Sequence, residues 1–310
     1  MSYPIDRHTI NTPPPSGTTS PVDTRALAPY YRLTSLMRLP GKTGTGVYNE
    51  ATLYCAGDTL RLGWTSPTVD SRLRRGDIVT VREGRARAPH PEVLPVLRIA
   101  RVDQPVAAVN PFDLVPSSWL HDRALAQRAK NLWEQMERPL QHLVNAVLWD
   151  GARFYRYVTG PVSVAAYPAP PGGTFRRAVA LAEEAVLLAD GLPNVARGVL
   201  IAAALLHEAG KADDFRVAVD GSGVTLSERG RWIGFEYTVL EWLGVARTKS
   251  IVPDALYLLL VHVLIAFHRP PESPQAIETA ILKVARGFID SPERVRNADR
   301  LIACASPSLH

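Results

Sequence analysis

Two kinds of hydrophobic periodicity divide the chain. Between about residues 30 and 105, apolar and polar residues alternate in short runs, as in "NEATLYCAGDTLRLGWT" (49–65), where "AGD" is a turn signal between two β-rich runs. "RRGDIVTVREG" (74–84) and "EVLPVLRIARVDQP" (92–105) predict two further strands, and Pro95 favours an edge position or a bulge. Several short strands at this spacing predict a small closed β-barrel.

Beyond the Pro- and Ser-containing segment "VNPFDLVPSSW" (109–119), the periodicity becomes helical. Within 120–149 apolar residues recur at steps of three and four, which is the pattern of an amphipathic helix. Glycine and proline separate the later helical segments. These further helices are predicted at about 174–190, 195–209, 232–245, 252–267 and 274–288. We therefore expect a multidomain β + all-α fold, with strands first and helices in the C-terminal two thirds.

Composition and length agree with this division. A chain of 310 residues, 46% hydrophobic and 21% charged, is long enough for two ordinary domains of a soluble globular protein. The first residues are rich in Pro, Ser and Thr and poor in large apolar groups, which predicts a disordered tail. The predicted order is a tail (1–24), a β-barrel domain (25–108), a helical linker (109–150) and a helical domain (151–310).

The sequence also limits the compartment. Cys55 and Cys304 are too few for a disulfide framework, and their spacing fits no zinc motif. The N-terminus lacks the basic-then-apolar layout of a signal peptide, so we expect a cytoplasmic protein. The most apolar run, residues 251–267, contains Asp254 and His262 and predicts a buried core helix, not a membrane partner.

The positive charge is concentrated in the N-terminal third. The chain carries a net charge of +5, and residues 25–105 alone hold 13 Lys and Arg against 7 Asp and Glu. A localised basic excess indicates a polyanionic partner, with a solvated basic face as the alternative. Arg61, Trp64, Arg72, Arg74 and Arg75 are the candidate nucleic-acid-binding residues, together with Tyr54. Trp64 and Tyr54 would either stack on bases or pack in the core, whereas "SRLRR" (71–75) predicts an exposed loop.

Several segments are similar to those of one enzyme family. "GGTFRRAVALAEEAVLLAD" (172–190) precedes "VLIAAALLHEAGK" (199–211), which is similar to a helix ending in His-Asp-x-Gly-Lys. "LSERGRWIGFEYTVLEWL" (226–243) resembles a Gly-His segment, and residues 258–290 resemble a helix with two histidines followed by a last helix with a ligand aspartate. Together with the barrel, these segments resemble YhaM-type 3′→5′ exoribonucleases. The resemblance covers nearly all of the chain after residue 25 and implies an OB-type β-barrel followed by an HD-like helical domain.

Most positions at which that family binds metal hold other residues in this chain. Two are arginines and two are phenylalanines, a His-Glu pair replaces the His-Asp pair, and one of the two adjacent histidines remains. In chain order these positions are Arg177, His207, Glu208, Phe235, Phe267, His268 and Arg286. A guanidinium cannot coordinate a cation and would repel it. We therefore expect a degenerate site with no metal cofactor; the alternative is Mn²⁺ or Mg²⁺ in a rearranged active site.

The stretch "LLHEAGKADDF" (205–215) contains what remains of the catalytic positions. We interpret His207, Glu208 and Lys211 as vestigial catalytic residues, although Lys211 would equally interact with the dipole of its own helix. Asp213 and Asp214 are expected in a solvated turn. A buried carboxylate needs a partner, so we predict that Glu208 pairs with Arg177, Arg286 or both, and that this internal cation replaces the metal.

These observations leave three interpretations of function. The first is a pseudoenzyme that binds single-stranded RNA or DNA, or a partner protein. The second is an active metal-dependent 3′→5′ exonuclease or phosphohydrolase with a rearranged site. The third, by analogy with HD domains of relaxase-type proteins, is an accessory factor in conjugative DNA transfer. A homo-oligomer is compatible with each of them.

Overall fold

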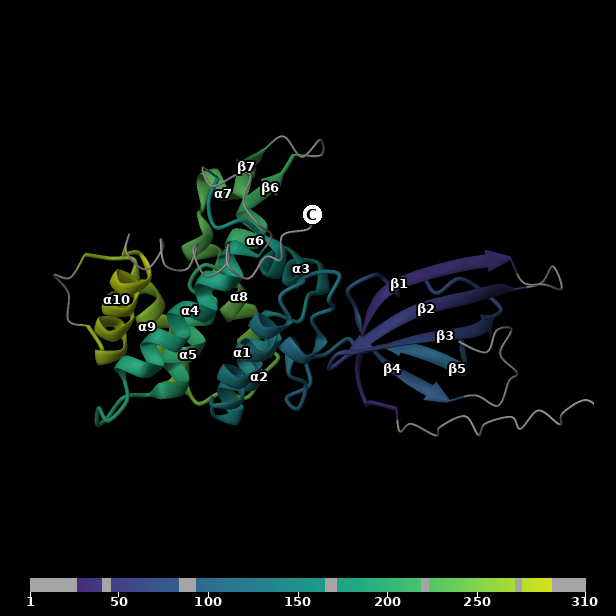
Figure 1. Cartoon of the computed structure of the whole chain (residues 1–310), viewed down its shortest axis with the longest axis horizontal. Coiled ribbons are helices and arrows are strands. Elements are labelled where there is room, and N and C mark those ends of the chain that lie inside the picture. The colour runs from purple at the N-terminus through teal and green to yellow at the C-terminus, as the bar shows by residue number, and fades with distance from the viewer. Residues whose placement is uncertain are drawn as a thin grey trace, which may run out of the picture.

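The computed structural model of the chain describes residues 27–40, 46–83, 93–164, 172–218, 223–270 and 275–291. A curled β-sheet closes into a barrel at the N-terminal end, and the helices follow it and gather beside it (Figure 1). The predicted tail (1–24) and Cys304 lie outside the described residues. Within those residues, no helix is long and apolar enough to cross a membrane.

The barrel is built from the alternating segments of the N-terminal third. Its strands follow the order β1-β2-β3-β5-β4 and close where β4 pairs with β1. Neighbouring strands are antiparallel except for β3 and β5, which are parallel. The strands are β1 (Tyr31–Pro40), β2 (Val47–Cys55), β3 (Asp58–Ser66), β4 (Ile78–Glu83) and β5 (Leu94–Arg101). Each prediction of a strand in this region is confirmed.

The "AGD" turn joins β2 to β3 as a two-residue hairpin. Ala56 and Gly57 both have positive φ, 48° and 93°. This is the conformation in which a two-residue turn matches the twist of its flanking strands. The hairpin is in register from Cys55 opposite Asp58 to Val47 opposite Ser66. The turn therefore sets which face of both strands points into the barrel.

The helical region follows the predicted periodicity with three differences. Its longer helices are α1 (Arg123–Glu134), α2 (Arg138–Val147), α3 (Gly151–Thr159), α4 (Gly173–Leu188), α5 (Arg197–Leu206), α8 (Phe235–Arg247), α9 (Asp254–Phe267) and α10 (Ile277–Ile289). The predicted helix over 120–149 is interrupted between α1 and α2, because Pro139 lacks an N–H and its ring clashes with the carbonyl four residues earlier. The helix α3 was not predicted.

The third difference corrects the all-α expectation. Residues Phe215–Val217 (β6) and Val224–Leu226 (β7) form a two-stranded antiparallel sheet between short helices. These short helices are α6 (Lys211–Asp214) and α7 (Glu228–Trp232), and a 3-10 helix, η1 (Pro111–Leu114), precedes α1. The hairpin projects from the helices in Figure 1. Strands of three residues are too short for alternation to show in the sequence.

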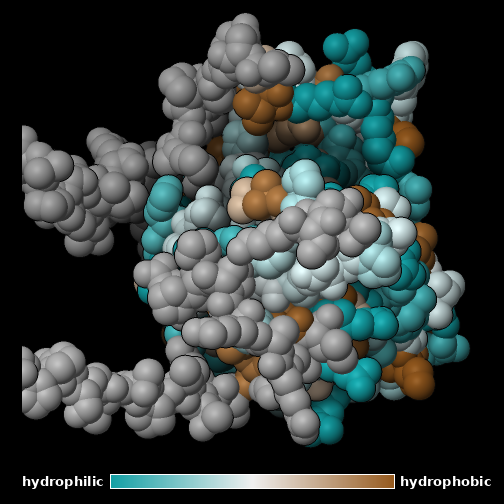
Figure 2. All heavy atoms as spheres, turned by 90° about the vertical axis from the view of Figure 1, so that its right-hand side faces the viewer, coloured by the Kyte–Doolittle hydropathy of each residue, from teal (hydrophilic) through white to brown (hydrophobic). Residues whose placement is uncertain are grey.

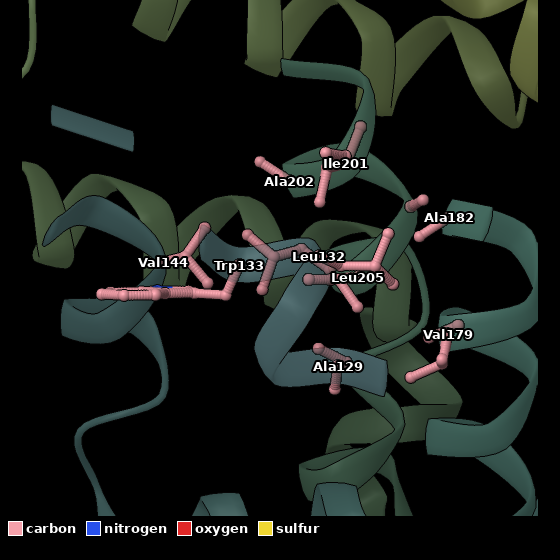
Figure 3. Close-up of a cluster of buried hydrophobic side chains, with 14 of the residues drawn as sticks. Ala129, Leu132, Trp133, Val144, Val179, Ala182, Ile201, Ala202 and Leu205 are labelled. Carbon is pink, nitrogen blue, oxygen red and sulfur yellow. The ribbon is translucent and has the colours of Figure 1, made fainter. Parts of the chain in front are cut away.

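The helices share one hydrophobic core. Figure 3 shows side chains of α1, α2, α4 and α5 meeting around Leu132 and Leu205. Every residue of α5 after the first is buried, so this helix is apolar on all sides, as expected for a central helix. The segment predicted as a helical linker is therefore part of the packed helical region, because α1 and α2 contribute Leu132 and Val144 to the same core.

A buried arginine joins the barrel to the helices. Arg32 of β1 is fully buried, and its Nε and Nη1 donate to the carbonyl oxygens of Leu114 and Gly76, each at 2.8 Å. Its guanidinium carbon also lies 4.8 Å from the ring centroid of Phe154 and 5.2 Å from that of Trp119. Such a desolvated cation requires these partners, so Arg32 fixes β1 against η1 and α3.

The junction is also close-packed at the backbone. Gly151 begins α3 against Gly76, and a Cβ on Gly151 would lie 2.1 Å from the Gly76 carbonyl oxygen. Trp149 Nε1 donates to Val102 O at 3.1 Å nearby. The loop before β4 is therefore held directly beside α3.

Figure 2 views the molecule from the barrel side, where the described hydrophobic residues form separate small patches among hydrophilic ones.

Candidate functional site

The stretch "LLHEAGKADDF" folds as the end of α5 followed by α6. α5 is followed by His207, Glu208 and a turn through Gly210 into Lys211. A Cβ on Gly210 would lie 2.1 Å from the carbonyl oxygen of Phe235, so only glycine allows α8 to approach here. Glu208 and Lys211 are 6% and 8% exposed. His207, Glu208 and Lys211, three titratable residues within one short segment, are therefore all buried.

Lys211, and not an arginine, is the hydrogen-bonded partner of Glu208. Its Nζ lies 2.7 Å from Glu208 Oε1 and also donates to Val162 O at 2.8 Å. The nearest arginine nitrogen, Arg177 Nε, is 3.9 Å from the same carboxylate oxygen, beyond hydrogen-bond distance. The prediction of an internal cation at Glu208 is confirmed, but the hydrogen-bonded cation is Lys211, which was not predicted; Arg177 contributes only the longer ion pair, and Arg286 pairs with another residue. Lys211 reaches the carboxylate because α6 begins three residues later, within one turn.

Both arginines are bound elsewhere, by a residue that the sequence reasoning missed. Arg177 Nη2 lies 2.8 Å from Asp290 Oδ1, and Arg286 Nε lies 3.5 Å from Asp290 Oδ2. Asp290 follows α10 and is four residues from Arg286, a spacing that places the two on one helix face. That spacing was the available signal. Asp290 is therefore the closest partner of both arginines, and Arg177 keeps only the longer 3.9 Å ion pair with Glu208.

The two remaining histidines are enclosed by aromatic rings. The His207 and His268 rings are stacked with centroids 6.3 Å apart, and Phe267 meets His207 edge-on at 5.2 Å. His207 Nδ1 lies 2.8 Å from Ala204 O, and burial lowers the pKa of His207 to about 4. Burial also lowers the pKa of His268, whose Nδ1 lies 3.2 Å from Glu236 Oε1. Both imidazoles are therefore neutral at pH 7.

Glu208 and Lys211 each stabilise the charged form of the other. Burial raises the pKa of Glu208, but His207, Lys211 and Arg177 together outweigh it, so its pKa lies below the usual value. Burial lowers the pKa of Lys211, and the Glu208 carboxylate opposes this shift. The ammonium is also near the Phe235 ring, 5.0 Å from its centroid. Glu208 and Lys211 therefore form a buried carboxylate–ammonium pair whose ammonium packs near the Phe235 ring.

These residues do not fit a hard divalent metal. Such a metal needs several oxygen and nitrogen donors that converge on one point. In the part of the chain that the structure describes, no group of three or more His, Cys, Asp or Glu residues has this arrangement. Glu208 Oε1 already binds the Lys211 ammonium, and Arg177 adds a second positive charge nearby. We therefore derive no metal-dependent step for this site.

The predicted solvated turn at Asp213 and Asp214 is wrong. Asp214 is buried, accepts a hydrogen bond from Thr238 Oγ1 at 3.2 Å, and has its pKa raised by burial. Asp213 binds two arginines of α3, with Arg156 Nη2 at 2.5 Å and Arg153 Nε at 3.6 Å. Both carboxylates therefore fix α6 to its neighbours, which a sequence window of a few residues does not reveal.

In the barrel, the candidate stacking residues are packing residues. Trp64 and Tyr54 are each 7% exposed, and Trp64 belongs to the barrel core. Trp64 points into the barrel, whereas Tyr54 follows the inward-facing Leu53 and is covered on the outer face beside η1 and α1, so neither offers a face to a base. Arg61 is bound to Glu50 across the hairpin, Nη2 to Oε1 at 2.5 Å. Burial therefore removes the two rings as stacking faces, whereas Arg61 remains exposed and is oriented by Glu50.

The "SRLRR" loop is exposed, as predicted, and only part of its charge is paired. Arg72 binds Asp70, Nε to Oδ1 at 3.2 Å. Arg74 and Arg75 are exposed, and neither side chain has an ion pair with another residue that the structure describes. Leu73 is buried in the barrel core, which anchors the loop. Two unpaired guanidinium groups are thus presented next to α3.

A second pair of exposed arginines was missed. Arg82 of β4 lies directly opposite Arg98 of β5, and both are exposed. Neither forms an ion pair within the described ranges. Like charges directly opposite on neighbouring strands destabilise a sheet. Their pairing could not be read from the sequence, since it depends on the register of two strands joined by residues 84–93.

A cleft of about 870 Å³ adjoins the segment that contains Lys211. Lys211 lines it, together with residues of α3, α4 and β6. The comparisons with known proteins add no relative: no family model, no curated protein and no solved structure matches the chain.

Proposed function

We propose that this protein binds single-stranded nucleic acid through exposed arginines of its barrel and does not hydrolyse it by a metal-dependent mechanism. The observation that carries the proposal is the cross-strand pair Arg82–Arg98. Two guanidinium groups held opposite each other repel in the free protein, and a phosphate backbone relieves that repulsion. Arg74 and Arg75 extend the unpaired positive charge to the loop before β4.

The topology of the barrel supports this proposal. A five-stranded barrel with the order β1-β2-β3-β5-β4 and a parallel β3–β5 contact is the arrangement expected of an OB-fold, an architecture that binds oligonucleotides, and it supports our interpretation of the barrel as OB-type. The absence of exposed Trp64 and Tyr54 rings places the weight of binding on phosphate contacts. We therefore infer binding with little base preference at the barrel.

The helical region supports the second half of the proposal. A buried helix that ends in His207-Glu208 is what the resemblance to HD-type domains implies, and we interpret the region as a degenerate HD-like domain. The Lys211 ammonium neutralises Glu208 where a metal ion would be needed for hydrolysis. Binding without cleavage is consistent with both parts.

The test is a titration of a fluorescent single-stranded DNA and RNA with the full chain at several salt concentrations. The double variant Arg82→Ala/Arg98→Ala should bind more weakly and with a shallower salt dependence, by about 0.7 in log–log slope for each lost phosphate contact. The control Arg138→Ala/Arg231→Ala removes two exposed arginines of the helical region, with the same change in net charge. No binding by the wild type, or equal losses in both double variants, would overturn the proposal.

A further inference from the structure

The cleft beside Lys211 has the dimensions and chemistry of a ligand site. It lies between the C-terminal half of α3, the start of α4, residues 118–122 and β6, and its volume of about 870 Å³ is within the range of small-molecule sites. We propose that this cleft binds a nucleotide, with a flat base and an attached phosphate. The nucleotide is either a free nucleoside monophosphate or the end of a single strand.

Four cations line the cleft, and three are held in place by carboxylates. These cations are Arg156, Arg176, Lys211 and Arg216. Arg156 binds Asp213 and also donates from Nε to Ala212 O at 2.6 Å, whereas Arg176 Nη1 binds Asp122 Oδ2 at 2.8 Å. A guanidinium carries five N–H donors, so each arginine is oriented by its carboxylate and retains donors for a phosphate.

Arg216 supplies the unopposed charge. It is exposed on β6, and it has no ion pair or hydrogen bond from its side chain within the part of the chain that the structure describes. Since Glu208, Asp122 and Asp213 each oppose one of the other cations, Arg216 leaves the cleft with a net positive charge. A dianionic phosphate meets this charge better than a neutral ligand does.

Two aromatic residues provide the complement for a base. Tyr155 is 42% exposed and lines the cleft, so its ring can be covered by a base. Trp119 meets Tyr155 edge-on, with centroids 5.1 Å apart. Trp119 Nε1 is buried and has no hydrogen-bond partner among the described residues.

The cleft is also placed to receive the end of a strand bound at the barrel. Gly76 follows the 71–75 loop and packs against Gly151, the first residue of α3. Tyr155 is four residues further along α3, a rise of about 6 Å along the helix axis. The strand-end form of this proposal rests on the proposed function, whereas the binding of a free nucleotide does not.

The first experiment is calorimetric titration of the full chain with AMP, GMP, CMP and UMP, without added metal. At least one should bind with a dissociation constant below 1 mM, which corresponds to a binding free energy more favourable than about −4 kcal/mol. Adenosine without phosphate and inorganic phosphate without base should each bind at least about tenfold more weakly than AMP. If none of the monophosphates binds at millimolar concentration, the proposal is overturned.

Variants locate the binding. Arg216→Ala and Tyr155→Ala should each weaken the best monophosphate roughly tenfold, since each removes a charged contact or a stacking face. The matched controls are Arg138→Ala and Tyr237→Ala, exposed residues on α2 and α8, which should leave affinity unchanged. Equal effects in site and control variants would overturn the assignment.

The same variants separate this proposal from the proposed function. If the barrel binds strands and the cleft binds nucleotides, Arg82→Ala/Arg98→Ala reduces oligonucleotide affinity and leaves AMP affinity intact. Failure of the cleft alone appears as oligonucleotide binding without binding of any monophosphate. Failure of the barrel alone appears as monophosphate binding that Arg216→Ala weakens, with no salt-sensitive oligonucleotide binding. Competition by AMP for a 3′- or 5′-terminal label decides between the free nucleotide and the strand end.

Discussion

Lys211 Nζ lies 2.7 Å from Glu208 Oε1 in the helical core, and the same ammonium donates to Val162 O. The pair thus connects the end of α5 with the segment that follows α3. A metal ion would connect these elements through several ligands, whereas here one lysine does so by charge and hydrogen bonding. The cation belongs to the chain, so the connection needs no bound ion.

Breaking this pair should destabilise the fold more than removing it entirely. Glu208→Gln and Lys211→Met should each lower the free energy of unfolding by roughly 3–5 kcal/mol, because each leaves the other group buried without its counter-charge. The double variant Glu208→Gln/Lys211→Met should be less destabilised than the sum of the two. Urea unfolding of the four proteins measures this coupling. Additive losses, or single losses below about 1 kcal/mol, would contradict a buried pair.

Metal removal should have no effect. Chelation of the purified protein should leave its thermal midpoint unchanged, and no Mn²⁺- or Mg²⁺-dependent 3′→5′ degradation of RNA or DNA should be detectable. The reason is that Lys211 and Arg177 place positive charge around the Glu208 carboxylate. Metal-dependent degradation that His207→Ala abolishes would instead support an active phosphohydrolase.

Stability should decrease as the pH falls below neutrality. Burial lowers the pKa of His207 from 6.5 to about 4. Between pH 6.5 and 4 the imidazole binds a proton in the unfolded chain but not in the folded chain. The free energy of unfolding therefore decreases as the pH is lowered, by about 3 kcal/mol across this range. His268 shifts in the same direction and adds to the effect. Urea unfolding at pH 7.5, 6.5 and 5 should show this decrease, with a shallower decrease in His207→Gln. Equal slopes in both proteins would contradict it.

The junction between barrel and helices should not accept a methyl group. Gly151→Ala would place a Cβ 2.1 Å from the Gly76 carbonyl oxygen, so one backbone must move. We expect a loss of roughly 1–3 kcal/mol in the free energy of unfolding. Gly244→Ala, in α8 with no atom within 4 Å of the added Cβ, is the matched control and should be neutral or stabilising. A tolerated Gly151→Ala would show that the two parts are not closely packed here.

The arginines of the 71–75 loop should contribute to strand binding. Arg72→Ala/Arg74→Ala/Arg75→Ala should weaken single-strand binding and reduce the log–log salt slope by about 0.7 for each lost phosphate contact. Arg72 already binds Asp70, so most of the change should come from Arg74 and Arg75. Fluorescence anisotropy at increasing salt measures it. An unchanged slope would exclude this loop from the binding surface.

Much of the local structure could be predicted from the sequence. The β2–β3 hairpin follows from two alternating runs around "AGD", and α5 follows from an apolar run followed by glycine. Both depend on contacts between residues near in sequence. The break at Pro139 was also a local signal, but the periodicity on either side of it concealed the break. The candidate site was recovered only in part, since His207, Glu208 and Lys211 lie together but Lys211 was not predicted to be the hydrogen-bonded partner of Glu208.

The sequence by itself determined the order of strands and helices, the concentration of positive charge in the first third, and the enclosure of His207-Glu208 at the end of a buried helix. Only the tertiary structure decided that Lys211 neutralises Glu208, that Asp290 holds Arg177 and Arg286, that Trp64 faces the core and that Arg82 meets Arg98. Periodicity and turn chemistry are properties of residues near each other in the sequence, so they can be predicted from short sequence windows. The partner of a buried charge comes from groups that packing brings together from distant segments. Because an unpaired charge is costly to bury, the pairing depends on the tertiary structure.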